Sequence, residues 1–206
     1  MTAEAVRLEL YRAKVIAVLR ESDPEVCFAK AAALAQGGVS VLEVTWTTPD
    51  AVTVIRRIVD GQLGLPGAGS IRTVAQAQEA VGAGARFLVS PTCVSEVAAW
   101  ATSHGIVYAP GALTPTEILA AWNAGGRPVK VFPCSALGGP SYIKAVLAPL
   151  PELELVPTGG VSLENMKAYL EAGASAVGLG DSFTRGDPSD LVSRARQAVA
   201  IAAGLP

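Results

Sequence analysis

Two charged side chains stand alone inside apolar segments that are typical of buried strands. Lys130 is the single charge in PVKVFP (128–133), and Glu43 is the single charge in VSVLEVTW (39–46). Removing an unpaired ammonium or carboxylate from water is costly unless another group compensates for the lost hydration. The two positions therefore need a mutual partner or a chemical role.

Burial gives a lysine and a glutamate complementary reactivity. Loss of hydration disfavours the ammonium form, so a neutral amine becomes available to attack a ketone and form an imine. Burial raises the pKa of a carboxyl group toward the range useful for proton transfer, although a neighbouring opposite charge opposes both effects. Lys130 is the best imine-forming candidate, because Lys14 lies at the entrance of the first predicted strand. The remaining lysines lie in helical segments: Lys30, Lys144 and Lys167.

The segments that carry these residues belong to a regular alternation of strands and helices. The predicted strands are residues 15–19, 39–46, 63–69, 86–90, 106–110, 128–133, 153–158 and 175–180. Eight such repeats, each followed by an Ala-rich helical segment, predict an α/β protein with a TIM (β/α)8 barrel. Near-continuous apolar strands fit a parallel sheet that is covered on both faces. A doubly wound open sheet is the alternative, but it needs a Gly-rich turn after the first strand, where this chain has RESDPE.

The barrel is expected to occupy the whole chain, residues 1–206, as one domain. An amphipathic N-terminal helix (1–13) is predicted before the first strand, in place of a signal peptide. Helix starts are predicted from capping residues and from proline in the first turn. They are Asp23-Pro24-Glu25, Thr48-Pro49-Asp50, Thr114-Pro115-Thr116-Glu117 and Ser162-Leu163-Glu164.

A TIM barrel would bring Glu43 and Lys130 together. Its chemistry lies at the carboxyl ends of the strands, and the second and sixth of eight strands stand opposite each other across the ring. Alternation puts Glu43 on one face with Thr45, and Lys130 on one face with Phe132. We expect the two charges to meet at the barrel mouth. The alternative is a structural ion pair that merely offsets its own desolvation.

Glycine-rich turns follow the last two predicted strands, as PTGG (157–160) and GLGDS (178–182). Exposed backbone amides in such turns bind phosphate, and the last two strands are where TIM barrels commonly hold it. The glycines could also serve only to make tight turns. Asp181 argues against phosphate, because its carboxylate would repel a dianion unless it caps the helix and points away.

Composition excludes several classes of function. A net charge of −2 leaves no electrostatic footprint for nucleic acid, and no apolar run is long enough to span a membrane. Three cysteines without a CxxC pair and a single histidine argue against a disulfide framework, a zinc site or a His-rich metal site. We expect a cytoplasmic protein that needs no metal and no cofactor.

The ordered motifs resemble those of the class I KDPG/KHG (2-keto-3-deoxy-6-phosphogluconate/2-keto-4-hydroxyglutarate) aldolase family. LEVT (42–45), GAGS (67–70), VKVFP (129–133) and PTGG (157–160) occur in the family's order, and the resemblance covers nearly the whole chain. It implies a homotrimeric barrel that cleaves a keto-acid substrate to pyruvate and an aldehyde. The products would be pyruvate with glyceraldehyde 3-phosphate from the phosphorylated acid, as in the Entner–Doudoroff pathway, or pyruvate with glyoxylate from 4-hydroxy-2-oxoglutarate.

The resemblance also implies site residues. Lys130 would form the imine and Glu43 would move protons. The implied substrate-binding residues are Arg20, Thr45, Thr47, Gly69, Ser70, Pro91, Phe132 and Thr158. The implied phosphate-binding residues are Gly159, Gly160, Gly180 and Ser182.

One position departs from the family pattern. Many members have an arginine that holds the pyruvyl carboxylate where this chain has Thr47, so that task passes to Arg20, to Thr47 itself or to amides near Gly69 and Ser70. Two other hypotheses remain open on the residues alone. One is an isomerase or epimerase that uses Glu43 as its base, and the other is a noncatalytic barrel that binds a sugar phosphate.

Overall fold

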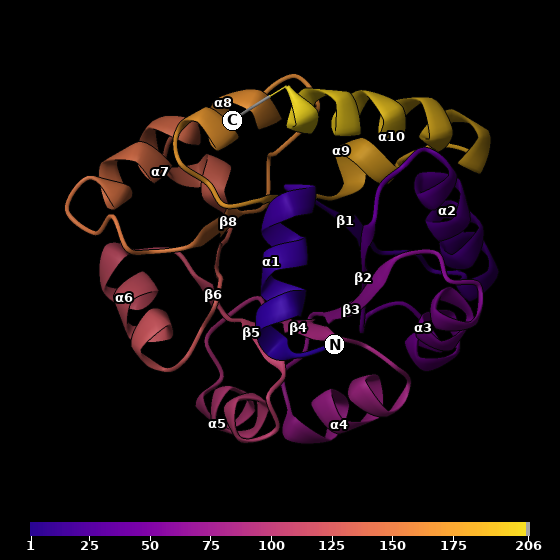
Figure 1. The fold of residues 1–206 in the computed structure, drawn as a ribbon, viewed down its shortest axis with the longest axis horizontal. Coiled ribbons are helices and arrows are strands. Elements are labelled where there is room, and N and C mark those ends of the chain that lie inside the picture. The colour runs from indigo at the N-terminus through magenta and orange to yellow at the C-terminus, as the bar shows by residue number, and fades with distance from the viewer. Residues whose placement is uncertain (205–206) are drawn as a thin grey trace.

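Parallel strands alternate with helices in the computed structural model, which describes residues 1–204. Figure 1 shows the helices as a ring around the strands. The strands are β1 (Val15–Leu19), β2 (Val41–Thr45), β3 (Leu65–Gly69), β4 (Phe87–Val89), β5 (Val107–Ala109), β6 (Gly111–Ala112), β7 (Val129–Val131), β8 (Leu155–Pro157) and β9 (Val177–Leu179). All eight predicted strands are confirmed, and the sixth predicted strand, which carries Lys130, is β7.

The strands form two parallel sheets that join at both ends. Their orders are β5-β4-β3-β2-β1-β9 and β6-β7-β8. A bridge between Thr158 and Gly178 connects β8 to β9. At the other join, β5 runs into β6 through Pro110, whose carbonyl accepts a hydrogen bond from the Lys130 amide at 2.9 Å. Proline has no N–H for the ladder, so β5 and β6 act as one interrupted strand of an eight-stranded barrel. The predicted TIM barrel is confirmed and the open-sheet alternative is wrong.

Helices lie outside the strands, most of them between one strand and the next. They are α1 (Ala3–Ala13), α2 (Pro24–Gln36), α3 (Ala51–Asp60), α4 (Val74–Gly82), α5 (Ser95–Ser103), α6 (Pro115–Asn123), the 3₁₀ helix η1 (Cys134–Leu137), α7 (Pro140–Leu147), α8 (Met166–Glu171), α9 (Asp181–Thr184) and α10 (Pro188–Ala203). The predicted N-terminal helix is confirmed as α1. Asp23 caps α2, and Thr114 caps α6 through a capping box with Glu117. None of the helices in residues 1–204 is long and apolar enough to cross a membrane.

Two predicted helix starts are wrong. Thr48 does not cap α3, which begins at Ala51, because its hydroxyl accepts a hydrogen bond from the Glu21 amide at 3.2 Å. Helix α8 begins at Met166 after Asn165, whose side chain accepts a hydrogen bond from the Ser162 amide at 2.8 Å. Short polar side chains bond nearby backbone in competition with the helix. The loops after β2 and β8 are therefore longer than expected.

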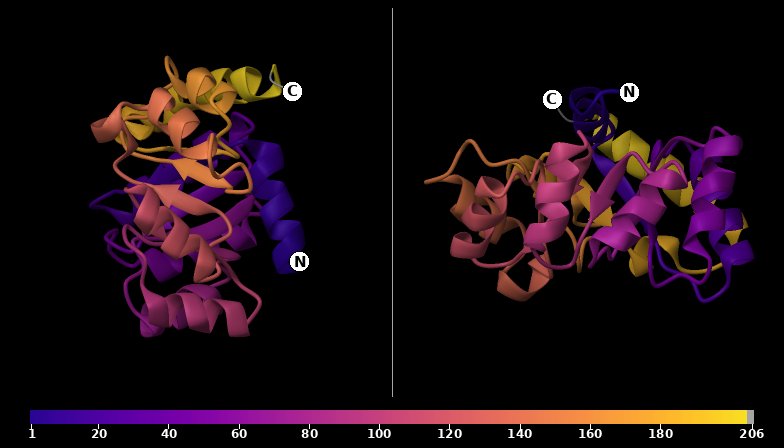
Figure 2. Two further views of the ribbon diagram at one scale, coloured as in Figure 1. Left: turned by 90° about the vertical axis from the view of Figure 1, so that its left-hand side faces the viewer. Right: turned by 90° about the horizontal axis from the view of Figure 1, so that it is seen from below.

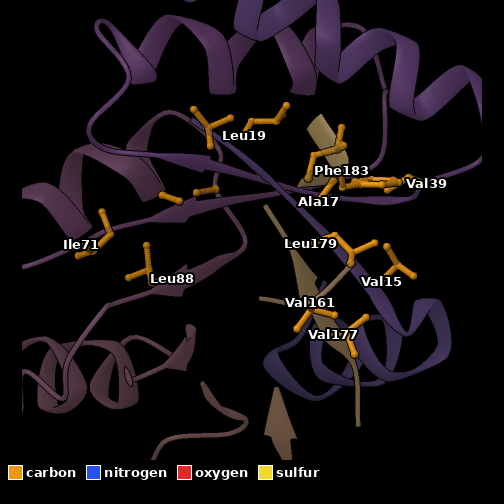
Figure 3. Packing of buried hydrophobic residues seen from close by; sticks show 14 of the residues in the cluster. Val15, Ala17, Leu19, Val39, Ile71, Leu88, Val161, Val177, Leu179 and Phe183 are labelled. Carbon is orange, nitrogen blue, oxygen red and sulfur yellow. The ribbon is translucent and has the colours of Figure 1, made fainter. Parts of the chain in front are cut away.

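Side chains of each strand alternate between two apolar layers. On β1, Val15, Ala17 and Leu19 face the surrounding helices, and Figure 3 shows them near Leu179 and Phe183. The barrel interior holds a second cluster that includes Ile16 of β1 and Val41 of β2. The same alternation turns Glu43 and Thr45 toward the interior, two and four residues after Val41.

Helix α1 closes the end of the barrel where the strands begin. Val6 and Leu10 of α1 are buried in the interior cluster together with Phe87 of β4. Figure 1 shows α1 lying across the centre of the ring, and both views of Figure 2 place it outside the strands at one end. Apolar contact with α1 therefore leaves only the opposite end, where the strands finish, open to a ligand.

Candidate active site

A cavity of about 540 Å³ lies at the carboxyl ends of the strands. The predicted residues that line it are Arg20, Thr47, Ser70, Pro91, Lys130, Phe132, Thr158, Gly159, Gly160, Gly180 and Ser182. Glu43, Thr45 and Gly69 are not among the lining residues. They are buried at the same end of β2 and β3, which pair in parallel. One site therefore collects residues from strands that are far apart in the sequence.

Lys130 and Glu43 face each other across this end of the barrel, as predicted. The Lys130 Nζ lies 3.9 Å from the Glu43 Oε1, and the two side chains are 9% and 3% exposed. That separation allows charge attraction but exceeds hydrogen-bond distance, and Glu43 Oε1 has no hydrogen-bond partner within the described part of the chain. A structural ion pair needs short hydrogen bonds to offset its desolvation. This geometry argues against a purely structural ion pair and leaves both groups able to bind a substrate.

The environment of Glu43 keeps its carboxyl group ready to carry a proton. Burial raises the pKa of Glu43, and the nearby charges of Lys130 and Arg20 lower it by less. Gly69 provides the space that Glu43 occupies, because a Cβ at position 69 would lie only 1.9 Å from the Glu43 Oε1. Gly69 was predicted as a substrate-binding residue, and the structure places it against the catalytic carboxyl candidate instead of in the cavity lining.

Two arginines flank strand β2 at the mouth. Arg20 follows β1 and Arg72 follows β3, both are exposed, and both line the cavity. No salt bridge holds either guanidinium among residues 1–204. Sequence reasoning missed Arg72, although it stands only two residues after the GAGS motif, at the end of a predicted strand. Arginines on the two neighbouring loops can thus supply the positive charge that Thr47 lacks.

Hydroxyl groups lie between these arginines and the barrel centre. Thr45 is fully buried, and its Oγ1 lies 2.9 Å from the Oγ1 of Thr47, which faces the cavity. Ser70 lines the cavity with a φ of 60°, a left-handed conformation that is unfavourable for a residue with a side chain. Such outliers often occur at binding sites, where the surrounding structure imposes them.

The opposite side of the lysine is apolar. The Lys130 Nζ lies 5.4 Å from the ring centroid of Phe132, which is half-buried and lines the cavity. Thr158 is buried beside it, in the space left by Gly178, where a Cβ would lie 2.4 Å from the Thr158 Oγ1. This wall limits the access of water to the amine without supplying it with an ionic partner.

The two glycine-rich turns lie side by side at the cavity, because a bridge joins Thr158 to Gly178. Gly159 and Gly160 have φ values of 84° and 80°, which glycine adopts without strain. The Ser182 Oγ donates a hydrogen bond to the Val161 carbonyl at 3.1 Å, so its proton is already committed. Asp181 lines the same part of the cavity, and it does not cap α9, whose N-cap is Gly180. The predicted phosphate residues are brought together, but a carboxylate stands among them.

Groups suited to binding a metal ion are scattered in this fold. Within residues 1–204, no three His, Cys, Asp or Glu side chains gather in a geometry that could hold one. The cysteines are free: Cys27 and Cys134 are buried, and Cys93 is exposed. Glu43 and Lys130, the candidate acid–base and nucleophilic groups at the mouth, lie on strands β2 and β7.

Comparison with known proteins identifies the family of this chain. The family model described as "KDPG and KHG aldolase" matches residues 6–196. A 2-dehydro-3-deoxy-phosphogluconate aldolase of Pseudomonas aeruginosa is 39% identical over 76% of this chain and 70% of its own length. A 2-dehydro-3-deoxy-6-phosphogalactonate aldolase of Escherichia coli is 35% identical over 90% of this chain and 91% of its own length.

A solved structure adds a covalent intermediate to these relatives. It is a KDPG aldolase from Legionella pneumophila with pyruvate captured as a carbinolamine. It is 29% identical to this chain, with a TM-score of 0.80, and the match covers 99% of this chain and 98% of that one. An enzyme of this fold thus attacks a keto acid with an amine.

Proposed function

This chain belongs to the KDPG and KHG aldolase family and is an aldolase, and from that premise we propose that Lys130 is its imine-forming residue. We propose further that Glu43 moves the protons of a retro-aldol reaction in which a 2-keto-4-hydroxy acid yields pyruvate and an aldehyde. The proposal rests on the geometry of Lys130 and Glu43. A buried lysine amine lies 3.9 Å from a buried carboxyl oxygen that lacks a hydrogen bond, at the edge of a cavity.

The first half of the reaction joins substrate to enzyme. The neutral Lys130 amine attacks the C2 ketone, and the C–N bond forms as the oxygen takes a proton from the Glu43 carboxyl group. Loss of water from this carbinolamine gives the imine. The raised pKa of Glu43 suits this task, because a carboxyl group with an ordinary pKa would already be ionised at neutral pH.

The second half breaks the carbon chain. Glu43, now ionised, accepts the proton of the C4 hydroxyl as the C3–C4 bond breaks, and the bonding electrons move into the imine to give an enamine. The aldehyde half leaves, and Glu43 returns the proton that it accepted to C3 of the enamine, which restores the protonated imine. Water then hydrolyses this imine to pyruvate and the neutral Lys130 amine, and the proton released goes back to Glu43.

The charges around the mouth suggest how the substrate lies. Arg20 and Arg72 offer cations to the pyruvyl carboxylate from the two loops that flank Thr47. Thr47 and Ser70 add hydroxyls on the same side, while Phe132, Pro91 and Thr158 pack against the carbon chain. The aldehyde half then extends toward Gly159, Gly160, Gly180 and Ser182. The two candidate substrates are KDPG and 4-hydroxy-2-oxoglutarate.

Trapping with borohydride tests the proposal. Incubation with pyruvate and sodium borohydride should reduce the imine and add one pyruvyl group to Lys130, detectable by peptide mass spectrometry. Lys130→Met should abolish the adduct. The matched control is Lys144→Met, because Lys144 is an exposed lysine of α7 outside the cavity. A pyruvyl adduct on another lysine, or none at all, would reject Lys130 as the imine-forming residue. Complete absence of an adduct is what an isomerase or a simple binding barrel would give.

We also propose a homotrimer that acts in the cytoplasm, in a sugar-acid pathway of the Entner–Doudoroff type. Support comes from the family to which the chain belongs. Light scattering coupled to gel filtration should give three times the chain mass, and a monomer mass would overturn the trimer.

A further inference from the structure

The loop after β3 carries two cavity residues, Ser70 and Arg72, on either side of a buried one. Ile71 between them is fully buried in the apolar layer that also contains Leu88 of β4 (Figure 3). Ser70 has a φ of 60°, which is costly for a residue with a side chain. Such a conformation persists only where the surrounding structure imposes it. The neighbours of this loop must therefore hold it in place.

Backbone hydrogen bonds hold both sides of Ser70. The carbonyl that precedes Ser70 accepts a hydrogen bond from the Trp46 amide at 2.7 Å. The amide that follows Ser70 donates a hydrogen bond to the Val89 carbonyl at 3.1 Å. The two peptide groups that define the conformation of Ser70 are thus attached to the ends of β2 and β4.

Two buried hydroxyl side chains hold the next peptide group of the loop. Ser90, fully buried after β4, donates from its hydroxyl to the Ile71 carbonyl at 2.5 Å. The Tyr108 hydroxyl of β5 donates to the Ser90 Oγ at 2.9 Å and accepts from the Val94 amide at 3.3 Å. Each hydroxyl therefore donates once and accepts once. Burial raises the pKa of Tyr108, so it remains a donor at neutral pH.

This pair of hydroxyls acts on the cavity from behind its wall. Neither Ser90 nor Tyr108 is among the residues that line the cavity. The carbonyl that Ser90 holds belongs to the peptide group that leads directly into Arg72. Without the Ser90 hydroxyl, that carbonyl is free to turn and Ser70 can relax from its left-handed conformation. Both the Ser70 hydroxyl and the Arg72 guanidinium would then move.

We propose that Ser90 and Tyr108 are positioning residues that hold the loop after β3 where Ser70 and Arg72 can bind the pyruvyl carboxylate. This inference rests on the proposed retro-aldol function and adds to it two residues that do not touch the substrate. A shift of about 1 Å in a binding group can lower activity by two orders of magnitude, so a fixed loop matters for the reaction.

Pyruvate is the sharpest probe, because it contains only the carboxylate and the ketone of the substrate. We measure the pyruvate concentration that gives half the maximal initial rate of borohydride trapping on Lys130. It should rise about 10-fold in Ser90→Ala and roughly 2- to 5-fold in Tyr108→Phe, while the maximal rate changes much less. With the full keto acid, KM should rise in the same order and by more than kcat falls.

Ser103→Ala is the matched control. The Ser103 hydroxyl also donates to a backbone carbonyl, that of Trp100 at 2.9 Å, but it is exposed on α5 and outside the cavity. This variant should leave the half-saturating pyruvate concentration unchanged. Tyr108→Phe keeps the aromatic ring in its apolar layer, so it decides the outcome if Ser90→Ala fails to fold.

A purely structural role would lower the unfolding temperature of both variants and leave their dependence on pyruvate as in wild type. That result in the folded variants would overturn the inference. Absence of a pyruvyl adduct on Lys130 in the wild type would instead reject the proposed function. Normal trapping in the wild type, with an unchanged pyruvate dependence in the variants, would reject only the positioning role of Ser90 and Tyr108.

Discussion

The two ends of the barrel hold charged side chains in different ways. At the end closed by α1, Glu154 accepts hydrogen bonds from Arg7 at 2.8 Å and from Tyr11 at 2.5 Å. At the open end, Lys130 and Glu43 are more deeply buried, yet they stand 3.9 Å apart and Glu43 Oε1 has no hydrogen bond. The charges at the closed end are fully bonded to one another. The charged groups at the open end lie close together but make no hydrogen bond to each other, so they can bind a substrate.

This difference separates a structural use of charge from a chemical one. The hydrogen bonds around Glu154 stabilise the attachment of α1, and removal of Glu154 leaves the Tyr11 hydroxyl without its acceptor, whereas Arg7 keeps its bonds to Glu4. Burial and the adjacent Glu154 also raise the pKa of Tyr11, so it remains a hydrogen-bond donor at any ordinary pH. A pair without a hydrogen bond contributes less to stability and can bond a substrate instead. Four substitutions test this contrast.

Lys130→Met should have the largest effect on catalysis. It removes the imine-forming amine, so we expect kcat to fall by at least about 10⁴-fold. Stability should fall by less than in a variant that breaks hydrogen bonds, because the Lys130 Nζ makes none within residues 1–204 and Glu43 can take up a proton when its neighbouring positive charge is removed. Turnover assays and thermal unfolding would check both parts. A variant that loses stability but keeps turnover within ten-fold of wild type would reverse the contrast between the two ends.

Glu43→Gln should slow catalysis by roughly 10²- to 10⁴-fold, the usual contribution of a positioned acid–base group. The amide keeps the shape of the carboxyl group but cannot move protons. Single-turnover measurements should show slower pyruvyl adduct formation as well as slower cleavage. Glu154→Gln is the matched control at the closed end, and it should leave both rates unchanged. Equal rates in Glu43→Gln and wild type would exclude Glu43 from the chemistry.

Glu154→Leu should affect stability and spare activity. Arg7 and Tyr11 lose their shared acceptor, and we expect the free energy of unfolding to fall by about 1–3 kcal/mol. Urea unfolding measures this change, and kcat/KM at a temperature where the variant is folded should match that of wild type. If catalysis fell while stability held, the closed end would be coupled to the chemistry.

The smallest expected effect is a pH-dependent difference in stability between Glu43→Gln and wild type. Below pH about 4.5, the usual carboxyl pKa, Glu43 is protonated both folded and unfolded, and the two proteins should be equally stable. Above that pH the unfolded wild type loses the Glu43 proton while the folded protein keeps it, so the wild type loses stability until the pH reaches the raised pKa of the folded state, whereas the amide variant does not. The advantage of Glu43→Gln should therefore grow from pH 4 to pH 8. A difference that stays constant over this range would argue against a raised pKa.

Much of the site could be predicted because strands impose a simple geometry. A lone charge in an apolar strand stands out, alternation places it on a face, and the order of strands in a barrel puts the second opposite the sixth. Lys130 and Glu43 follow from these rules. Arg72 does not, because it lies in a loop whose path no periodicity describes. The helix starts at Thr48 and Ser162 failed because hydrogen bonds in the folded loops decided the conformation of those residues.

The sequence by itself determined the alternation of strands and helices, the closure into a barrel and the identity of the two charged residues at its mouth. Those features depend on local patterns of apolar side chains, which are readable along the chain. Only the tertiary structure decided that Glu43 lacks a hydrogen bond, that Gly69 makes room for it and that Asp181 lines the cavity. Each of these depends on distances between segments that are remote in sequence, and such distances follow from packing rather than from any local pattern.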